Sequence, residues 1–189
     1  GDELFGGYHY YKIAKFLNPL YKMPRQVRSL AGSSAKLVPL HKFQLLGSAL
    51  QQRNSARSFA FSRSIAKDFH NILDEEVLSR TKSLLDLFED KARDLPRGLH
   101  ASEQGMRLDS IHTLNDDYLQ KTDVASMSYS LESRAPLLGK DVAEWAMKLP
   151  VRWKMRGFGN KYLLRKLLYR YVPQKLVDRP KRGFGVPID

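Results

Sequence analysis

Apolar residues in this chain recur mostly at the three- and four-residue spacing of an α-helix. One apolar stripe covers residues 162–172, has basic residues between its members, and ends at Pro173. A second stripe covers residues 142–149 and ends at Pro150. Because proline cannot continue a helix, we expect one helix over each stripe. β-branched residues never alternate with polar ones over a strand-length segment, so the sequence predicts a mainly α chain.

Capping residues mark three more helices. Asp74 is a suitable N-cap for one long helix through the apolar residues 77–88, which should end at residues 94–96. Another helix is expected to start near Ser102. The next should begin at residues 115–117, where short acidic side chains suit a first helical turn.

The stretch from residue 23 to residue 61 is less periodic. Helical turns are expected at residues 26–30 and 43–50, with a break between them at Gly32-Ser33-Ser34. No internal repeat or low-complexity tract divides the 189 residues, which are enough for one hydrophobic core. We therefore expect a single domain.

Composition narrows the class of protein. No apolar run is long enough to cross a bilayer, and the first residues lack the pattern of a secretory signal, so no membrane partner is expected. The absence of cysteine excludes disulfides and thiolate metal sites and fits a cytoplasmic protein. A net charge of +12 favours an anionic partner such as nucleic acid, a membrane surface or a phosphate-bearing small molecule. Eleven Lys and Arg lie between residues 152 and 182, either as a solvated face or as a polyphosphate pocket.

The first stretch whose residues could form a functional site is GDELFGGY at residues 1–8. The adjacent carboxylates of Asp2 and Glu3 could hold a hard cation such as Mg²⁺. They could equally be the acids of an ordinary helix start, which is the commoner use of such a pair. Gly6 and Gly7 allow the backbone to turn or to approach a ligand closely.

The second stretch is NDDYLQKTDVASMSYSLESRAPLLG at residues 115–139. Lys121 and Asp123 are two residues apart, so on a helix they face different directions and should have different partners. Glu132 and Arg134 are expected to form ion pairs or hydrogen bonds that shape the following loop. Structural and functional interpretations are both open for these residues.

The third stretch is KLVDRPKRGFGVPID at residues 175–189. Lys181 and Arg182 precede a glycine-containing loop, where a lysine is a good point charge for a phosphate or a developing anion. Such a loop also suits nucleic-acid phosphates. The five histidines show no metal-binding spacing and are expected to be surface or packing residues.

Together the three stretches resemble the synthetase domain of the glutamine-dependent asparagine synthetases. GDELFGGY resembles the family segment S-G-x-G-x-D-E-x-F-G-G-Y without its first half, and KRGFGVPI resembles its K-x-G-F-x-x-P-I loop. The middle stretch resembles L-x-x-x-L-x-K-x-D-x-x-S-M-x-x-S-L-E-x-R-x-P-F-L-D. The resemblance implies an α/β adenine-nucleotide α-hydrolase-like (PP-loop) domain. Residues 1–189 are then expected to be its helical C-terminal portion, truncated at both ends.

The resemblance also implies a reaction and its residues. Such an enzyme converts aspartate to asparagine through β-aspartyl-AMP, using ATP, Mg²⁺ and ammonia from glutamine, which a glutaminase domain of the full-length chain supplies. Asp2 matches the residue that holds Mg²⁺ and pyrophosphate, with Gly1 and Arg182 beside the same ligand, and Glu3 supports the site. Lys181 matches the lysine that stabilises the pyrophosphate leaving group or the tetrahedral intermediate.

Two departures from the family pattern leave alternatives. The S-G-G-x-D-S pyrophosphate loop is absent, so the isolated fragment is expected to be inactive and to bind ATP no tighter than millimolar. Val124 and Gly139 replace residues common in the family, so a relative that amidates another carboxylate, for example in polysaccharide biosynthesis, is one alternative. A basic helical nucleic-acid-binding module is another, although no recognition helix or stacking platform supports it. A non-catalytic helical scaffold is a third.

Overall fold

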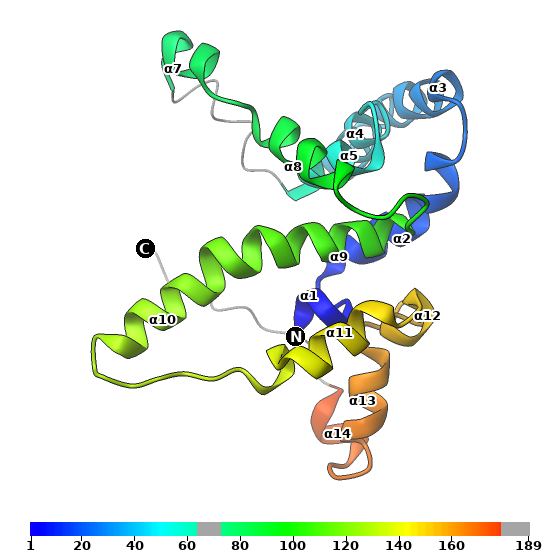
Figure 1. Cartoon of the computed structure of the whole chain (residues 1–189). Coiled ribbons are helices and arrows are strands. Elements are labelled where there is room, and N and C mark those ends of the chain that lie inside the picture. Colours follow the sequence, from blue (N-terminus) through cyan, green and yellow to red (C-terminus); the bar gives the residue numbers. More distant parts are fainter. Residues whose placement is uncertain (64–72, 179–189) are drawn as a thin grey trace, which may run out of the picture.

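A computed structural model describes residues 1–63 and 73–178, and Figure 1 shows them as an assembly of helices. Within these ranges the backbone forms no strand, only an isolated bridge between Arg156 and Gly159. The predicted mainly α chain is confirmed. The elements are α1 (Asp2–Phe5), α2 (His9–Tyr21), α3 (Arg25–Lys36), α4 (His41–Leu50), α5 (Ser55–Arg63), α7 (Glu75–Arg80), α8 (Leu84–Arg93), α9 (Ala101–Ile111), the π-helix η1 (Thr113–Leu119), α10 (Gln120–Met127), the 3₁₀ turn η2 (Pro136–Leu138), α11 (Lys140–Lys148), α12 (Val151–Lys154), α13 (Tyr162–Leu168) and α14 (Gln174–Val177).

The main core lies where α2, α5, α8 and α9 meet. Tyr11 stacks on Phe59 with ring centroids 6.0 Å apart, and Phe59 packs against Phe88 at 6.3 Å. Met106 and Leu108 of α9 complete this buried cluster. Burial of large aromatic and aliphatic side chains is the dominant favourable term in folding, so this cluster holds α2 against α9.

A second, smaller core fixes the N-terminal helix. Leu4 and Phe5 of α1 are buried against Ala146 of α11, with Leu164 of α13 packed at the edge. These contacts place α1 among α9, α11 and α13 (Figure 1). Leu4 and Phe5 therefore fix the position of α1 and, with it, of the carboxylates of Asp2 and Glu3 that precede them.

The predicted break at Gly32-Ser33-Ser34 is wrong, because α3 runs through these residues to Lys36. A Cβ on Gly32 would lie 2.7 Å from the carbonyl oxygen of Gly47, and one on Gly47 would lie 2.4 Å from that of Gly32. The glycines therefore let α3 and α4 approach closely, rather than ending a helix. Buried Arg28 caps the end of α4 by donating from Nε to the carbonyl of Leu50 at 2.9 Å.

The single long helix predicted from Asp74 to residues 94–96 is also wrong. Asp74 does cap a helix, accepting from the Glu76 amide at 3.0 Å, but that helix is the short α7. Ser83 then caps α8 by accepting from the Asp86 amide at 3.2 Å. The Ser83-x-x-Asp86 pattern resembles a capping box, so a second local N-terminus interrupts the apolar periodicity.

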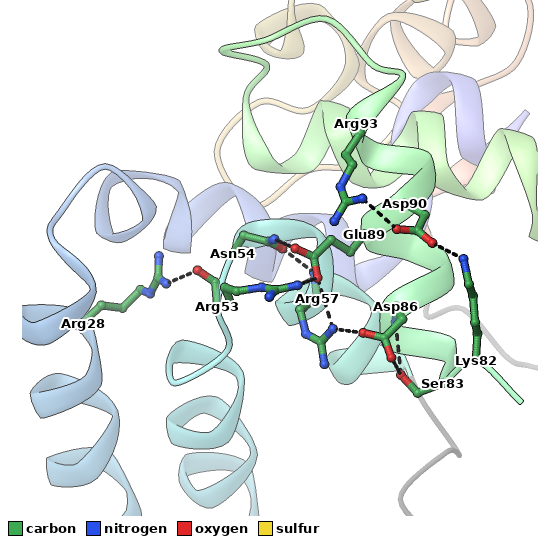
Figure 2. A network of polar contacts seen from close by, with 10 residues as sticks. All are labelled: Arg28, Arg53, Asn54, Arg57, Lys82, Ser83, Asp86, Glu89, Asp90 and Arg93. Atoms are coloured by element: carbon green, nitrogen blue, oxygen red, sulfur yellow. Dashed lines mark hydrogen bonds and ion pairs between the residues drawn. The ribbon is translucent and has the colours of Figure 1, made fainter. Parts of the chain in front are cut away.

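A polar network ties α8 to the start of α5 (Figure 2). The Glu89 carboxylate accepts from Asn54 Nδ2 at 2.8 Å and from Arg57 at 3.1 Å, and it also pairs with Arg53. Arg57 pairs in turn with Asp86. The hydrogen bond from Arg53 is the largest of the effects that lower the pKa of Glu89, so this carboxyl stays ionised between the two helices.

The helix predicted to start at residues 115–117 does not begin there. α9 starts at Ala101, as expected near Ser102, and continues through η1 into α10 without a break. In Figure 1 these three elements form one rod that extends beyond the core. The acidic residues Asp116 and Asp117 lie inside the π-helical turn rather than at a helix start.

Both helices predicted in the C-terminal third are present. α11 ends at Lys148, just before Pro150, as expected. α13 ends at Leu168, earlier than the predicted boundary at Pro173, and turns follow it. Among the described residues, no helix is both long and apolar enough to cross a membrane.

Candidate functional site

The acidic motif forms the one-turn helix α1, and its two carboxylates lie in different environments. Gly6 ends the helix in the left-handed conformation with φ of 69°. Glu3 is buried and accepts a hydrogen bond from the Tyr8 hydroxyl at 2.8 Å. Asp2 instead lines a cavity in the part of the chain that the structure describes. Only Asp2 of this pair is therefore placed to meet a ligand.

Asp2 forms an ion pair with a residue distant in sequence. Its carboxylate lies 2.8 Å from Nζ of Lys161, and the two side chains are 26% and 36% exposed. Gly7 makes room for this pair, because a Cβ there would lie 1.8 Å from Asp2 Oδ1 and 2.5 Å from Lys161 Cε. Asn160 Nδ2 donates to the Gly7 carbonyl at 2.5 Å and holds the two segments together.

The backbone at Lys161 is strained. Its φ of 50° is in the left-handed region, which non-glycine residues rarely adopt. Such strain costs energy and clusters at functional sites, where surrounding contacts enforce it. Here the enforcing contacts are the ion pair with Asp2 and the hydrogen bond from the neighbouring Asn160 to Gly7.

The cavity beside this ion pair has a volume of about 1440 Å³ and lies between the N-terminal segment and the region 158–178. Four cationic side chains line it, against the carboxylates of Asp2 and Asp178. The cations are Lys12, Lys161, Arg165 and Lys166. Aromatic rings of Tyr8, Phe158, Tyr162 and Tyr169 contribute apolar wall. Cations with aromatic faces suit a ligand that carries both phosphates and a planar ring.

The electrostatics of the cavity favour anions. Hydrogen bonds from Arg156 and then Lys166 lower the pKa of the Tyr162 hydroxyl, because both cations favour its ionised form. Arg165 pairs with Asp178 at the far wall. Four cations against two carboxylates leave the wall with an excess of positive charge, which attracts anions such as a phosphate-bearing molecule.

The structure does not bring the second motif onto the cavity wall. Lys121 pairs with Asp117 at 3.3 Å on the solvent-exposed rod of η1 and α10, where Asp123 is also exposed. Glu132 and Arg134 form an ion pair with each other at 2.8 Å, and both are strongly exposed, so their role in shaping the following loop stays a prediction.

The other predicted residues have simpler outcomes. Lys181 and Arg182 lie outside the described residues. Gly1 does not line the cavity; its carbonyl accepts the Phe5 amide at 3.1 Å. Within residues 1–63 and 73–178 there is no cluster of three or more side chains able to hold a metal ion. Any cation at Asp2 would therefore need ligands besides these side chains.

Sequence reasoning missed the role of Lys161 as the partner of Asp2. The available signal was the basic run from residue 152 to residue 182, which predicts either a solvated face or a polyphosphate pocket. Lys161, Arg165 and Lys166 from this run line the cavity, whereas Lys154 is buried beneath the helices. Which basic residues of this run reach the cavity depends on how α13 packs against α1, and the sequence does not show that packing.

Comparison with known proteins identifies the family. The family model for asparagine synthase matches residues 1–189, so the chain belongs to the asparagine synthase family. It is 31% identical over 193 residues to asparagine synthetase (glutamine-hydrolyzing) 1 of Bacillus subtilis, covering 99% of this chain and 29% of that protein. Proteins of Mycobacterium bovis and Mycobacterium tuberculosis that carry this name provisionally are 31% identical over 194 residues.

The chain thus spans less than a third of the length of the curated relatives it matches, since it covers 28% of the mycobacterial proteins. No solved structure gives a significant match.

Proposed function

We propose that the chain is the helical C-terminal portion of the synthetase domain of an ATP-dependent amide-forming ligase. The observation that carries this proposal is the Asp2–Lys161 ion pair, 2.8 Å long, over Gly7 on the wall of a basic cavity. An acid and a base held together beside further cations match what binding and release of pyrophosphate require. The relatives are named as glutamine-hydrolysing asparagine synthetases, which supports the same class.

The proposed reaction has two steps. A carboxylate oxygen of the substrate, aspartate in our proposal, attacks the α-phosphorus of ATP, and the bond to pyrophosphate breaks. Ammonia, released from glutamine by a glutaminase domain of the longer protein, then attacks the acyl carbon of β-aspartyl-AMP, and AMP leaves. Both leaving groups are anionic, so cations that gather around them lower the barrier.

Asp2 is the residue that would hold Mg²⁺. Magnesium is usually bound by one or two carboxylates, with phosphate oxygens and water completing its six ligands. A single carboxylate on the cavity wall fits this mode, because the nucleotide supplies the phosphates. When bound, Mg²⁺ would neutralise charge on the pyrophosphate. Buried Glu3 would fix α1 through Tyr8, which keeps Asp2 at the cavity wall.

The lysines around the cavity are proposed to have different roles in binding the nucleotide. Lys161 lies within reach of anything bound at Asp2 and would contact a phosphate directly. Lys12 and Lys166 line the same cavity and would add long-range attraction for the nucleotide. Lys181 is proposed to stabilise the pyrophosphate or the tetrahedral intermediate, with Arg182 beside it.

Two substitutions in the longer protein test this proposal. Asp2→Asn and Lys181→Ala should each abolish carboxylate-dependent release of pyrophosphate from ATP, measured by a coupled phosphate assay. Asp141→Asn and Lys140→Ala are the matched controls, because both residues are exposed on α11 away from the cavity. Wild-type rates in Asp2→Asn or Lys181→Ala would overturn the assignment.

The nucleic-acid alternative makes a different prediction. Binding to RNA or DNA would be tight and would weaken steeply with added salt, because each phosphate contact releases counter-ions. Filter binding across a salt series separates the two functions.

A further inference from the structure

Helices α3 and α4 form a hairpin at the opposite end of the molecule from α13 and α14 (Figure 1). The two helices contact each other through Gly32 and Gly47, where the lack of side chains lets the backbones approach closely. Leu30 is two residues from Gly32, so on a helix it projects about 160° away from this contact. Its side chain is 70% exposed. One face of α3 therefore points away from the hairpin contact.

This outward face of α3 is apolar. Val27, Leu30 and Leu37 recur at intervals of three and seven residues, which is the spacing of one helical stripe. Six large apolar side chains of the hairpin and its flanks are each at least 42% exposed, and we call them its apolar surface: Met23, Val27, Leu30, Leu37, Leu40 and Phe43. A helix of a globular protein normally turns its apolar stripe toward the core. An exposed stripe of this kind indicates an interaction surface.

The same part of the chain carries many cations and no carboxylate. Residues 4–63 contain ten Lys and Arg but neither Asp nor Glu. Four of the cations are exposed on the hairpin and just before it: Lys22, Arg25, Lys36 and Lys42. The carboxylates of Asp86 and Glu89 on the nearby α8 pair instead with Arg57 and Arg53 (Figure 2). The apolar surface is therefore surrounded by positive charge.

The combination of exposed apolar side chains and cations selects the kind of partner. A second copy of this chain would bring like charges together, which disfavours a dimer through this surface. Nucleic acid would pair with the cations, but its affinity comes from phosphate contacts and gives the exposed leucines no role. A bilayer that contains anionic lipids satisfies both features, because its headgroups attract the cations and its acyl boundary accepts the apolar side chains.

We propose that the α3–α4 hairpin is an interfacial membrane-binding element, which lays its apolar surface on a bilayer that contains anionic lipids. The expectation of no membrane partner rests on the lack of a segment that could span a bilayer, and an interfacial helix needs no such length. Long lysine and arginine side chains suit this position, because their stems cover apolar surface while the charges stay among the headgroups. The inference goes beyond the proposed function and does not depend on it.

Co-sedimentation of the longer protein with lipid vesicles tests this proposal. One set of vesicles contains equal parts of phosphatidylglycerol and phosphatidylcholine, and the other contains phosphatidylcholine alone. We expect binding to the anionic vesicles that weakens as salt is added, because salt screens the attraction. Binding to the zwitterionic vesicles should be at least about tenfold weaker, since each cation near an anionic surface contributes about 1 kcal/mol.

Substitutions on the hairpin separate the apolar contribution from the electrostatic one. Leu40→Ser should weaken binding to the anionic vesicles about tenfold, because one leucine no longer enters the bilayer boundary. Leu30→Ser should have the same effect from the middle of α3. Lys42→Gln should weaken binding about fivefold. The matched controls are Leu176→Ser and Lys175→Gln on α14, where Leu176 is 57% exposed like Leu40, and both should bind as the wild type does.

Several outcomes would overturn the proposal. The longer protein would then fail to sediment with anionic vesicles, as expected if another part of it covers the hairpin, or would bind both vesicle types equally. Wild-type binding by both leucine variants, together with weaker binding by Lys42→Gln, would indicate a purely electrostatic contact such as one with nucleic acid. An equal loss in the α14 controls would show that the hairpin is not the binding element. None of these measurements uses the activity of the enzyme, so they are independent of the proposed function.

Discussion

Replacing Gly7 by alanine tests the geometry around Asp2 with the smallest possible change. The added Cβ would lie 1.8 Å from Asp2 Oδ1 and 2.5 Å from Lys161 Cε, so both side chains must move. Gly7 is not among the glycines with positive φ, so the backbone itself can accept alanine. The effect therefore comes from the side chains alone.

The magnitude follows from three terms. Overpacking costs about 1–3 kcal/mol, and loss of a half-exposed ion pair costs about 0.2–1 kcal/mol. Alanine also lowers the conformational entropy of the unfolded chain, which offsets about 0.4–1 kcal/mol of this loss. At the midpoints of these ranges the sum is a loss of about 2 kcal/mol, and a chain of this length loses about 2–4 °C in melting temperature for each kcal/mol. We expect Gly7→Ala to melt about 4–8 °C below the wild type.

Thermal unfolding followed by circular dichroism measures this shift, and a double-mutant cycle locates its cause. In an Asp2→Ala background the clash with Oδ1 is gone, so Gly7→Ala should cost at least about 1 kcal/mol less there. Gly139→Ala is the control, since its Cβ would meet only the Pro136 carbonyl oxygen at an ordinary 3.4 Å. A wild-type melting temperature for Gly7→Ala, or an equal cost in both backgrounds, would refute the reasoning.

Two further predictions concern stability. The pKa of Glu89 is lowered chiefly by the hydrogen bond from Arg53, so its stabilising contribution is present at neutral pH and is lost as pH falls below about 4. Glu89→Gln should lower the free energy of unfolding by about 1–3 kcal/mol at pH 7 and less at pH 3, measured by urea titration; an equal loss at both pH values would contradict this. Arg28→Lys should lower the free energy of unfolding by about 1–3 kcal/mol, because lysine cannot reproduce the guanidinium that donates to Leu50 and two further carbonyls. Arg25→Lys, on the exposed face of the same helix, is the control and should leave stability unchanged. Equal melting temperatures for the two arginine variants would contradict the capping role.

The sequence alone determined the helical fold class, several helix ends and the family motifs. The helical period of apolar residues predicts the mainly α fold, and prolines 150 and 173 bound α11 and the segment after α13. Asp74 caps a helix as its side chain suggests, because capping depends only on neighbouring residues. Three ordered motifs indicate the asparagine synthase family, which the match over residues 1–189 shows. These features involve residues close in sequence, so they are visible without a fold.

The helix boundaries predicted from the sequence are wrong where packing between residues distant in sequence outweighs local preference. Gly32 looks like a helix break, but the close approach of Gly47 makes it a contact between two helices. Asp116 and Asp117 look like a helix start, but they lie inside η1, which follows α9 and whose first residue, Thr113, donates a hydrogen bond to Asp109.

The functional site shows the same division. The sequence alone marked Asp2 as a candidate and the basic run as a possible phosphate pocket. It could not pair Asp2 with Lys161, because the two are 159 residues apart and meet only when α13 packs beside α1. Nor could it separate Glu3 from Asp2, since burial of one carboxylate and exposure of its neighbour depend on which way a one-turn helix faces. Tertiary structure decided both, because long-range packing sets which side chains share a cavity.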